Sequence, residues 1–498
     1  MNVNPITRLD YPDPDVIRVE DTYYMVSTTM HFMPGCEILQ SFDLVHWEHA
    51  TYVYETLDHT DAQQLKSGQN IYGQGMWAAS LRYHEGRFYI CFVANDTRKT
   101  YLYTSEKIDG PWKKQLIEGF YHDGSLLFDE DGRNYIVYGN DEIWITELNE
   151  DLTAPKKGGL HRLLVSDHKN PELGYEGSHI QKINGYYYIF LVHSLRDRWM
   201  RTEACFYSDS LEGEFTGGDV LCDDRGYCGQ GVAQGGIVDT PDGKWYAMLF
   251  QDSGAVGRIP ILLPVTWKDH FPVFGQNGHV PEEIEVHSTR PGYIYQPLVG
   301  SDDFCNGLLP RWQFNHDPDP RYYHLDALQG TYTITTREVC TELTQAVNTL
   351  TQRMSYPSCA AEVTVDASAL KEGDVAGLCA FQGCYAAVGI TKHHGKYEVL
   401  MLDKKEDGIL DMTEGTVVES HQMDFRLEAD FCNMKDEARC YYRVNKGDWL
   451  PIGTAHKLYF KLDHFTGCRF GLFCYAAEET GGSACFRDFK YYDVDEIS

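Results

Sequence analysis

Three carboxylates in the first 180 residues lie in short segments whose composition suits a catalytic site. They are Asp13 between two prolines, Asp123 before a Gly-Ser pair, and Glu176 after a tyrosine and before a Gly-Ser pair. Each lies near a strand-like run and next to Pro or Gly. Cleavage of a glycosidic bond needs a base that activates water and an acid that protonates the leaving oxygen, with pKa values pushed apart. Three acids on different strands can supply this chemistry if the fold brings them together.

A pattern of strand, short polar turn and aromatic strand repeats through roughly the first 290 residues. Four of the five turns contain Gly, and Asn-Gly or Asp-Gly between apolar runs is a strong hairpin signal. The turns are spaced widely enough for a four-stranded sheet with insertions, so five turns predict a propeller with five blades. They lie at Asp21-Thr22, Glu85-Gly86, Asp131-Gly132, Asn184-Gly185 and Asp242-Gly243.

The pattern breaks between Ser288 and Asp303, where a run of Arg-Pro-Gly and a run of Gly-Ser-Asp-Asp indicate a linker. From Phe304 onward alternating strands dominate, and helical periodicity is scarce. We therefore expect an all-β chain with two domains. Residues 1–290 should form the five-bladed propeller that carries the acids, and residues 300–498 a two-sheet sandwich.

Composition excludes several classes of partner. The formal charge is −31, with 74 acidic and 43 basic residues, so nucleic acid and anionic membranes are disfavoured. The sequence contains no run of 18 apolar residues, so it predicts no membrane span. The first ten residues lack the apolar stretch of a signal peptide. We expect a cytoplasmic protein, with homo-oligomers left open. The 15 cysteines are scattered without a CxxC motif, so we expect free, mostly buried thiols.

The three acidic segments resemble those of glycoside hydrolase family 43. That resemblance implies a five-bladed propeller in which Asp13 is the general base, Asp123 tunes the pKa of the acid and orients it, and Glu176 is the general acid. The order of the three segments matches the family, and a Tyr-Tyr strand follows Asp13 as it does there. Gly124 and Ser178 stand where the family commonly has proline.

Further segments extend the resemblance to the sugar pocket and to the second domain. It implies that Trp77, in Met-Trp-Ala-Ala, and Phe32, in an aromatic Pro-Gly loop, line the pocket and that Arg258 reaches the bound sugar. The second half resembles the concanavalin-like sandwich of the β-xylosidase branch. In the fifth blade the family often carries a His near a calcium ion on the axis, and Gln234 lies at or beside that position. Gln ligates metal less readily than His, so we include Gln234 with the substrate-binding residues and assign no metal ligand. We expect no required cofactor, and calcium on the axis is left open but disfavoured.

The leading hypothesis is an inverting exo-glycosidase that releases terminal pentoses, β-D-xylose or α-L-arabinofuranose, from xylo-oligosaccharides or arabinoxylan fragments. One alternative is an enzyme that acts mainly as an α-L-arabinofuranosidase. Another is a propeller that binds sugar without catalysis, since the aromatic residues alone could do that. A retaining fructosidase is disfavoured because the Asn-Asp-Pro-Asn-Gly and Arg-Asp-Pro segments of such enzymes are absent from the sequence.

Overall fold

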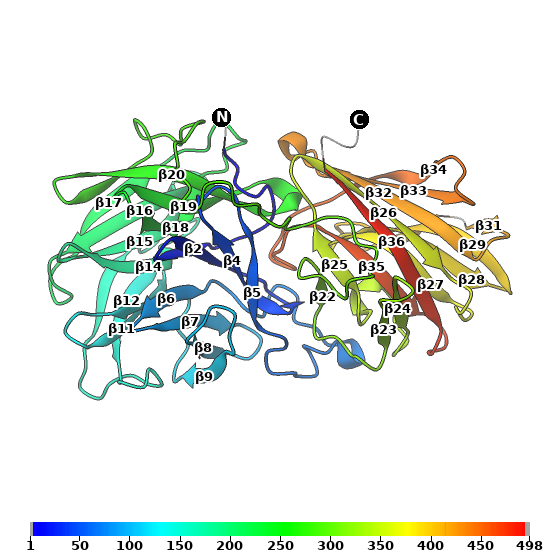
Figure 1. Ribbon diagram of the computed structural model, residues 1–498, viewed down its shortest axis with the longest axis horizontal. Coiled ribbons are helices and arrows are strands. Elements are labelled where there is room, and N and C mark those ends of the chain that lie inside the picture. Colours follow the sequence, from blue (N-terminus) through cyan, green and yellow to red (C-terminus); the bar gives the residue numbers. More distant parts are fainter. Residues whose placement is uncertain (1–2, 414, 494–498) are drawn as a thin grey trace.

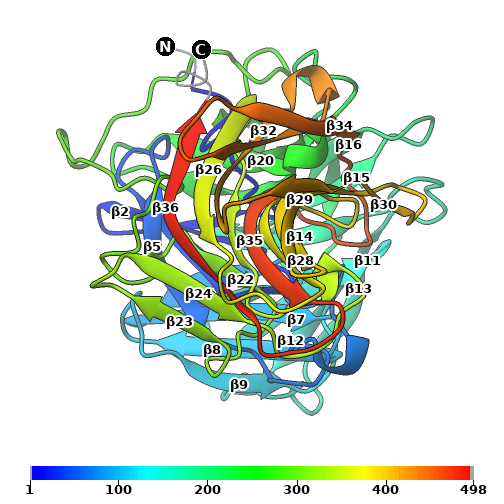
Figure 2. The same ribbon diagram turned by 90° about the vertical axis from the view of Figure 1, so that its right-hand side faces the viewer.

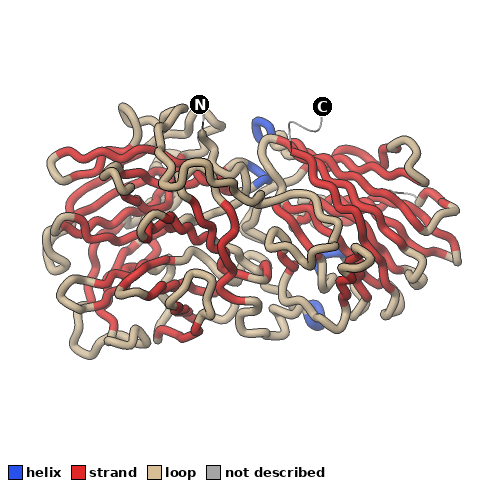
Figure 3. The backbone as a smooth tube through the Cα atoms, viewed as in Figure 1, coloured by secondary structure: helices blue, strands red, loops and turns tan. Residues whose placement is uncertain are grey.

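The computed structural model describes residues 3–413 and 415–493, which form two β-rich domains side by side (Figure 1). The predicted all-β class is confirmed: the described chain contains strands and four single-turn 3₁₀ helices (Figure 3). None of these helices is long and apolar enough to cross a lipid bilayer. The 3₁₀ helices are η1 (Lys66–Gly68), η2 (Gly254–Val256), η3 (Leu343–Gln345) and η4 (Cys432–Met434).

The first domain is a propeller of five four-stranded antiparallel blades, as the sequence predicts. Blade I comprises β1 (Asp15–Val19), β2 (Thr22–Ser27), β4 (Gly35–Ser41) and β5 (Glu48–Tyr54). Blade II comprises β6 (Ser80–His84), β7 (Arg87–Ala94), β8 (Lys99–Ser105) and β9 (Lys113–Ile117), and blade III comprises β10 (Ser125–Phe128), β11 (Asn134–Asn140), β12 (Glu142–Leu148) and β13 (His161–Ser166). Blade IV comprises β14 (Glu176–Ile183), β15 (Tyr186–Ser194), β16 (Arg201–Ser208) and β17 (Thr216–Leu221), and blade V comprises β18 (Val232–Asp239), β19 (Trp245–Asp252), β20 (Arg258–Lys268) and β21 (Phe271–Phe274).

The five predicted turns all connect the innermost strand of a blade to its second strand. Gly86, Gly132, Gly185 and Gly243 have φ between 78° and 85°, and Glu20 takes the left-handed position in blade I with φ of 56°. These conformations favour glycine, which explains why the turn residues could be recognised in the sequence. Around the axis β1 contacts both β6 and β18, so the ring of inner strands closes.

The second domain is a sandwich of two antiparallel sheets (Figure 2). The larger sheet has the order β3 (Phe32–Met33), β22 (Gln313–Asn315), β25 (Leu350–Arg353), β35 (Arg469–Ala476), β27 (Asp374–Phe381), β28 (Ala386–His393), β29 (Lys396–Lys404) and β30 (Leu410–Met412), with β31 (Thr416–Val418) also paired to β29. The other sheet has the order β23 (Tyr323–Asp326), β24 (Thr331–Thr335), β36 (Ser483–Asp493), β26 (Ser358–Asp366), β32 (Gln422–Asp430), β33 (Glu437–Val444) and β34 (Leu450–Lys457).

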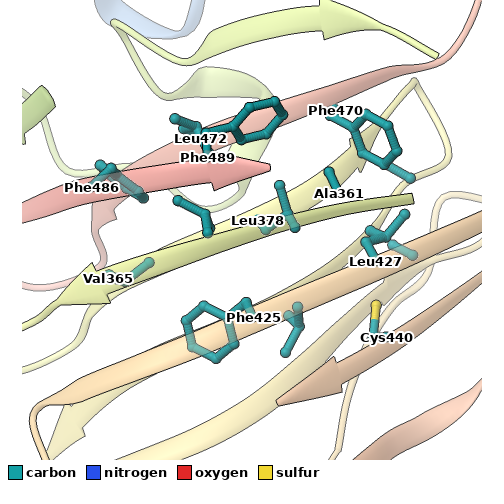
Figure 4. Close-up of a cluster of buried hydrophobic side chains, with 14 of the residues drawn as sticks. Ala361, Val365, Leu378, Phe425, Leu427, Cys440, Phe470, Leu472, Phe486 and Phe489 are labelled. Carbon is teal, nitrogen blue, oxygen red and sulfur yellow. The ribbon is translucent and has the colours of Figure 1, made fainter. Parts of the chain in front are cut away.

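The core of the sandwich lies between the inner faces of these sheets (Figure 4). Val365 and Phe425 from one sheet belong to the same buried cluster as Leu378, Phe470 and Leu472 from the other. Because side chains alternate along a strand, the neighbouring Phe473 and Tyr475 of β35 join a second buried cluster instead. The larger sheet is therefore buried on both faces.

One short strand of the propeller segment belongs to the sandwich. Strand β3 pairs with β22, with Phe32 opposite Asn315 and Met33 opposite Phe314. Phe32 has no exposed surface, and the guanidinium carbon of Arg469 lies 3.5 Å from the centre of its ring. Phe32 thus contributes directly to the interface between the two domains.

Buried polar contacts reinforce this junction. Asp10 accepts hydrogen bonds from two backbone amides, that of Arg258 in the propeller and that of Gly467 in the sandwich, each at 2.7 Å. Arg353 in the sandwich donates to the carbonyl of Asp10 at 2.8 Å and forms an ion pair with Glu37 at 2.8 Å. Since these groups are buried, separating the domains would expose charges and backbone groups whose partners lie across the interface.

Phe32→Ala should strongly destabilise the protein because it removes a fully buried ring from the interface and strips Arg469 of its stacking partner. Large-to-small aromatic substitutions in cores cost about 3–5 kcal/mol. The midpoint of urea unfolding measures this, with Leu328→Ala as the control because Leu328 is 95% exposed. Equal midpoints for the two variants would show that Phe32 does not hold the interface.

Candidate active site

The two predicted catalytic aspartates occupy the same place in two different blades. Asp13 lies two residues before β1, and Asp123 lies two residues before β10. Both have left-handed backbone conformations, with φ of 53° and 48°. Asp tolerates this conformation better than most residues, and the resulting turn places each carboxylate at the end of an innermost strand.

Glu176 reaches the same end of the propeller through a bulge in blade IV. It is the first residue of β14, and the pairing register with β15 shifts between Glu176 and His179. Gly177 has φ of 65°, and a Cβ atom there would lie 2.8 Å from Cγ of Gln234. The bulge therefore needs glycine, and it turns the Glu176 side chain out of the regular alternation of the strand.

A buried network beneath the acids joins the inner strands. Asp15 accepts hydrogen bonds from Arg82 Nη1 at 2.7 Å and from the amide of Leu81 at 2.8 Å, and its other oxygen lies 3.2 Å from His179 Nδ1. Burial would raise the pKa of Asp15, but Arg82 and His179 outweigh it and hold the pKa below its ordinary value. Arg82 also donates to Ser125 Oγ at 2.7 Å, which connects blades I, II and III.

This axis does not fit a calcium ion. Both oxygens of Asp15 have protein partners, one of them a guanidinium, and calcium prefers a shell of free oxygen ligands. Gln234 is buried, and its backbone amide donates to Glu203 at 2.7 Å. Its side chain can offer only one amide oxygen. We therefore involve no metal in the chemistry below.

Asp13 is held by groups from two blades and is covered by the sandwich. It accepts hydrogen bonds from Thr28 Oγ1 at 2.6 Å and from Arg258 Nη1 at 3.0 Å. The guanidinium of Arg258 lies 4.3 Å from the ring centre of Phe465, which belongs to the sandwich. Arg258 is 2% exposed, so its main contact is the carboxylate of Asp13. It therefore positions the predicted base.

Asp123 and Glu176 form a second group with two residues that the sequence analysis did not assign to the site. Asp123 Oδ2 accepts a hydrogen bond from the amide of Gly177 at 2.8 Å, next to the predicted acid. Asn140 donates to Glu176 Oε2 at 2.8 Å. His122 Nε2 lies 3.5 Å from both Asp123 Oδ2 and Glu176 Oε2. The four side chains come from the turn before β10, from β11 and from β14.

The three acids interact electrostatically, as expected for residues of one site. Burial raises the pKa of Asp123 to about 6, with His122 opposing the shift and the charges of Glu176 and Asp13 adding to it. Burial alone would lower the pKa of His122, but Asp123, Glu176 and Asp13 together raise it to about 9. Since Asp13 and Glu176 both act on the same two groups, the three predicted acids converge at one end of the propeller.

A cavity of about 700 Å³ is lined by Glu176 and by residues of both domains, whereas Asp13 and Asp123 are buried and do not line it. Trp77, His122 and Glu176 contribute from the propeller, and Phe460 and Phe465 from the sandwich. The ring centres of Trp77 and Phe465 lie 5.5 Å apart. Trp77 therefore occupies its predicted place in the wall. Phe32 is buried in the domain interface and Gln234 in the propeller core, and neither lines this cavity.

Some residues near the acids were not predicted from the sequence, which contained only weak indications of their position. His122 directly precedes Asp123, so its proximity to the acids could have been argued from the chain alone. Asn140 ends β11, one hairpin turn after His122. Arg201 reaches the cavity from β16 and pairs with Asp252 of β19 at 2.9 Å. Phe465 lies in the other domain, and nothing in its local sequence indicates a pocket.

One cluster of side chains in the described parts of the chain has the composition of a metal site. His122, Asp123 and Glu176 each present a ligand atom, and these atoms lie within 4.8 Å of one another. The three residues are also the acid–base group described above. Imidazole and carboxyl groups are also the usual groups of general acid–base catalysis, so we assign the cluster to that chemistry.

The site and fold together define a glycoside hydrolase. The sequence model of glycosyl hydrolases family 43 matches residues 3–272, and that of the β-xylosidase C-terminal concanavalin A-like domain matches residues 301–492. The chain belongs to glycoside hydrolase family 43.

Relatives with described activities match most of this chain in sequence. A β-xylosidase of Formosa agariphila is 26% identical over 99% of this chain and 89% of its own length. A non-reducing end α-L-arabinofuranosidase of Bacteroides ovatus is 24% identical over 82% of this chain and 79% of its own.

Solved structures agree with the fold. A bifunctional GH43-CE protein of Bacteroides eggerthii superposes with a TM-score of 0.92 at 42% identity; the match covers 99% of this chain and 64% of that one. An engineered family 43 enzyme, described as having both endo-xylanase and exo-arabinofuranosidase activity, superposes with a TM-score of 0.86 at 27% identity over 99% of this chain and all of that one.

Asp123→Asn should stabilise the protein at pH 7.5 while impairing catalysis. The folded-state pKa of Asp123, about 6, lies above the ordinary value of about 3.9. The folded protein therefore binds this proton more tightly, and the resulting stability is present at low pH and lost as the pH rises through about 6. Removing the buried charge should raise the unfolding free energy by about 1–2 kcal/mol at pH 7.5.

Urea unfolding at pH 7.5 and pH 4 measures this effect, which should vanish at the lower pH. Asp151→Asn is a matched control because Asp151 is exposed. A variant less stable than the wild type at pH 7.5 would show that ionised Asp123 is a net stabilising group.

Proposed function

We propose that this enzyme is an inverting exo-glycosidase that releases terminal β-D-xylose from xylo-oligosaccharides, with side activity on α-L-arabinofuranosides. The observation that carries the proposal is the convergence of Asp13, Asp123 and Glu176 at one end of the propeller, where Glu176 lines the cavity. A lectin has no need of three neighbouring carboxylates of which two are buried, because burying such groups is costly.

In the proposed reaction Asp13 and Glu176 act from opposite sides of the sugar. Asp13 takes a proton from a water molecule, whose oxygen attacks the anomeric carbon. Glu176 gives its proton to the glycosidic oxygen as the bond to that oxygen breaks. The two carboxyl groups of an inverting pair are expected to lie about 6.5–9.5 Å apart, so that a water molecule fits beside the sugar.

The remaining residues set the geometry of this reaction. Arg258 fixes the carboxylate of Asp13 from blade V. Asp123 fixes the backbone next to Glu176 through the amide of Gly177. Trp77 and Phe465 give the cavity aromatic walls on which a sugar ring can pack.

The cavity supports action on pentoses at chain ends. Its walls come from two domains, and the aromatic pair at one side can exclude the additional CH₂OH group of a hexose. One such group changes binding by only about 1–3 kcal/mol, so two pentoses can be accepted. The relatives named above act on xylosides or on arabinofuranosides. Initial rates on aryl β-D-xyloside and aryl α-L-arabinofuranoside decide whether this enzyme is mainly an arabinofuranosidase.

Asp13→Ala and Glu176→Ala should both lower turnover on xylobiose by about 10²–10⁴-fold, the usual contribution of general acid–base catalysis. On 2,4-dinitrophenyl β-D-xyloside the Glu176 variant should recover much of its rate, because that leaving group needs no proton. The Asp13 variant should stay slow, since water must still be activated. Steady-state kinetics on the two substrates measures the difference.

The controls separate this result from general damage. Circular dichroism should show that both variants keep the wild-type fold. Activity within a few-fold of wild type in either variant on xylobiose would refute the assignment. A rescue seen for Asp13→Ala and absent for Glu176→Ala would mean that the roles of acid and base are exchanged.

A further inference from the structure

His122 lies between the two carboxyl groups of the proposed acid pair. Its Nε2 is 3.5 Å from Asp123 Oδ2 and 3.5 Å from Glu176 Oε2. Its side chain is 19% exposed, and it lines the cavity. A hydrogen on Nε2 therefore lies between the carboxyl groups of Glu176 and Asp123. Hydrogen bonds of catalytic groups are often long without substrate and shorten in the reacting complex.

The groups that face His122 are mostly negative. Asp123 and Glu176 are its nearest charged neighbours, and Asp13 acts on it from blade I. The ring of Trp77 lies 6.0 Å away, centre to centre, and Asn140 donates to the same oxygen of Glu176 that His122 approaches. Within this described environment His122 is the positive group that can meet both carboxylates of the acid pair. The guanidinium of Arg201 also acts on Glu176, but it is paired with Asp252.

We propose that His122 is a positioning residue for proton donation: it bridges Asp123 and Glu176 and compensates the negative charge that forms on Glu176 when the glycosidic bond breaks. This inference rests on the proposed function, because it assigns His122 a role relative to Glu176 as the acid.

The proposal adds no reactant to the chemistry. The O–H bond of Glu176 breaks, and its proton goes to the glycosidic oxygen, which also keeps the electron pair of the broken C–O bond. The water oxygen forms the new bond to the anomeric carbon, and its proton goes to Asp13. His122 keeps its Nε2–H throughout and interacts more strongly with Glu176 Oε2 as that oxygen becomes charged. Asn140 supplies a second hydrogen bond to the same oxygen.

This role predicts a dependence on the leaving group. Where the leaving oxygen is strongly basic, proton donation is essential, and the charge on Glu176 develops fully in the transition state. Where the leaving group departs as a stable anion, Glu176 keeps its proton and His122 has no new charge to compensate. A residue that only supports the fold would affect both substrates equally.

The test compares His122→Leu, which removes the donor, with His122→Gln, which keeps a neutral donor. On phenyl β-D-xyloside the kcat of His122→Leu should fall by about 10- to 100-fold with little change in KM, the range expected for loss of a hydrogen bond to a charged group. On 2,4-dinitrophenyl β-D-xyloside it should stay within about threefold of wild type. His122→Gln should recover part of the loss on the phenyl substrate.

Two further variants make the outcome decisive. His161→Leu changes a histidine on β13 of the same blade, outside the cavity, and should leave both rates unchanged. Glu176→Ala should show the same leaving-group dependence in a stronger form. If Glu176→Ala shows it and His122→Leu loses equal activity on both substrates, or if Gln is no better than Leu, the role of His122 is overturned and the proposed function stands. If Glu176→Ala lacks the dependence, the proposed acid itself is wrong.

Discussion

The ion pair between Arg258 and Asp13 is the interaction on which the active site depends. Both side chains are buried, with Arg258 2% and Asp13 6% exposed. A buried pair is tolerated only where its geometry is good and its remaining polar atoms find partners. Here Thr28 supplies a hydrogen bond to Asp13, and Phe465 of the sandwich stacks on the guanidinium. Asp13, the proposed base, is therefore held by blade I, by blade V and by the second domain at once.

This arrangement explains why the sandwich is so firmly joined to the propeller. Phe465 can cover Arg258 only if the segment around Gly467 stays in place, and Asp10 binds the amides of Gly467 and Arg258 with its two oxygens. Strand β3 and the stacking of Arg469 on Phe32 also hold this junction. The second domain contributes to the site by excluding water and aligning a charge, while the three acids all belong to the propeller. Excluding water strengthens each charge interaction inside the cavity.

Local sequence patterns were sufficient to predict the architecture, and they also pointed to the three acids that the structure brings together. Most blade hairpins could be predicted because a tight turn favours Gly or Asn at a left-handed position, and such preferences can be read from single residues. Asp13, Asp123 and Glu176 could be found because their segments are ordered along the chain as in a known family.

What the sequence did not reveal are contacts between residues far apart in the chain. Phe32 and Trp77 both occur in aromatic segments expected at the pocket, yet Phe32 is buried in the interface because β3 pairs with a strand almost 300 residues later. Phe465 approaches Arg258 only in the folded protein. The part played by His122 depends on a 3.5 Å approach to Glu176 that its position beside Asp123 does not determine.

The most direct test of the central claim, that Asp13 activates water for a single displacement, is the configuration of the first product. Proton NMR of xylobiose hydrolysis, recorded before the released sugar mutarotates, distinguishes the α and β anomers of xylose. The account predicts that α-xylose forms first from the β-linked substrate, because water attacks the face opposite the leaving group. Initial release of β-xylose would contradict it, since retention requires a covalent intermediate and a nucleophile in place of a base.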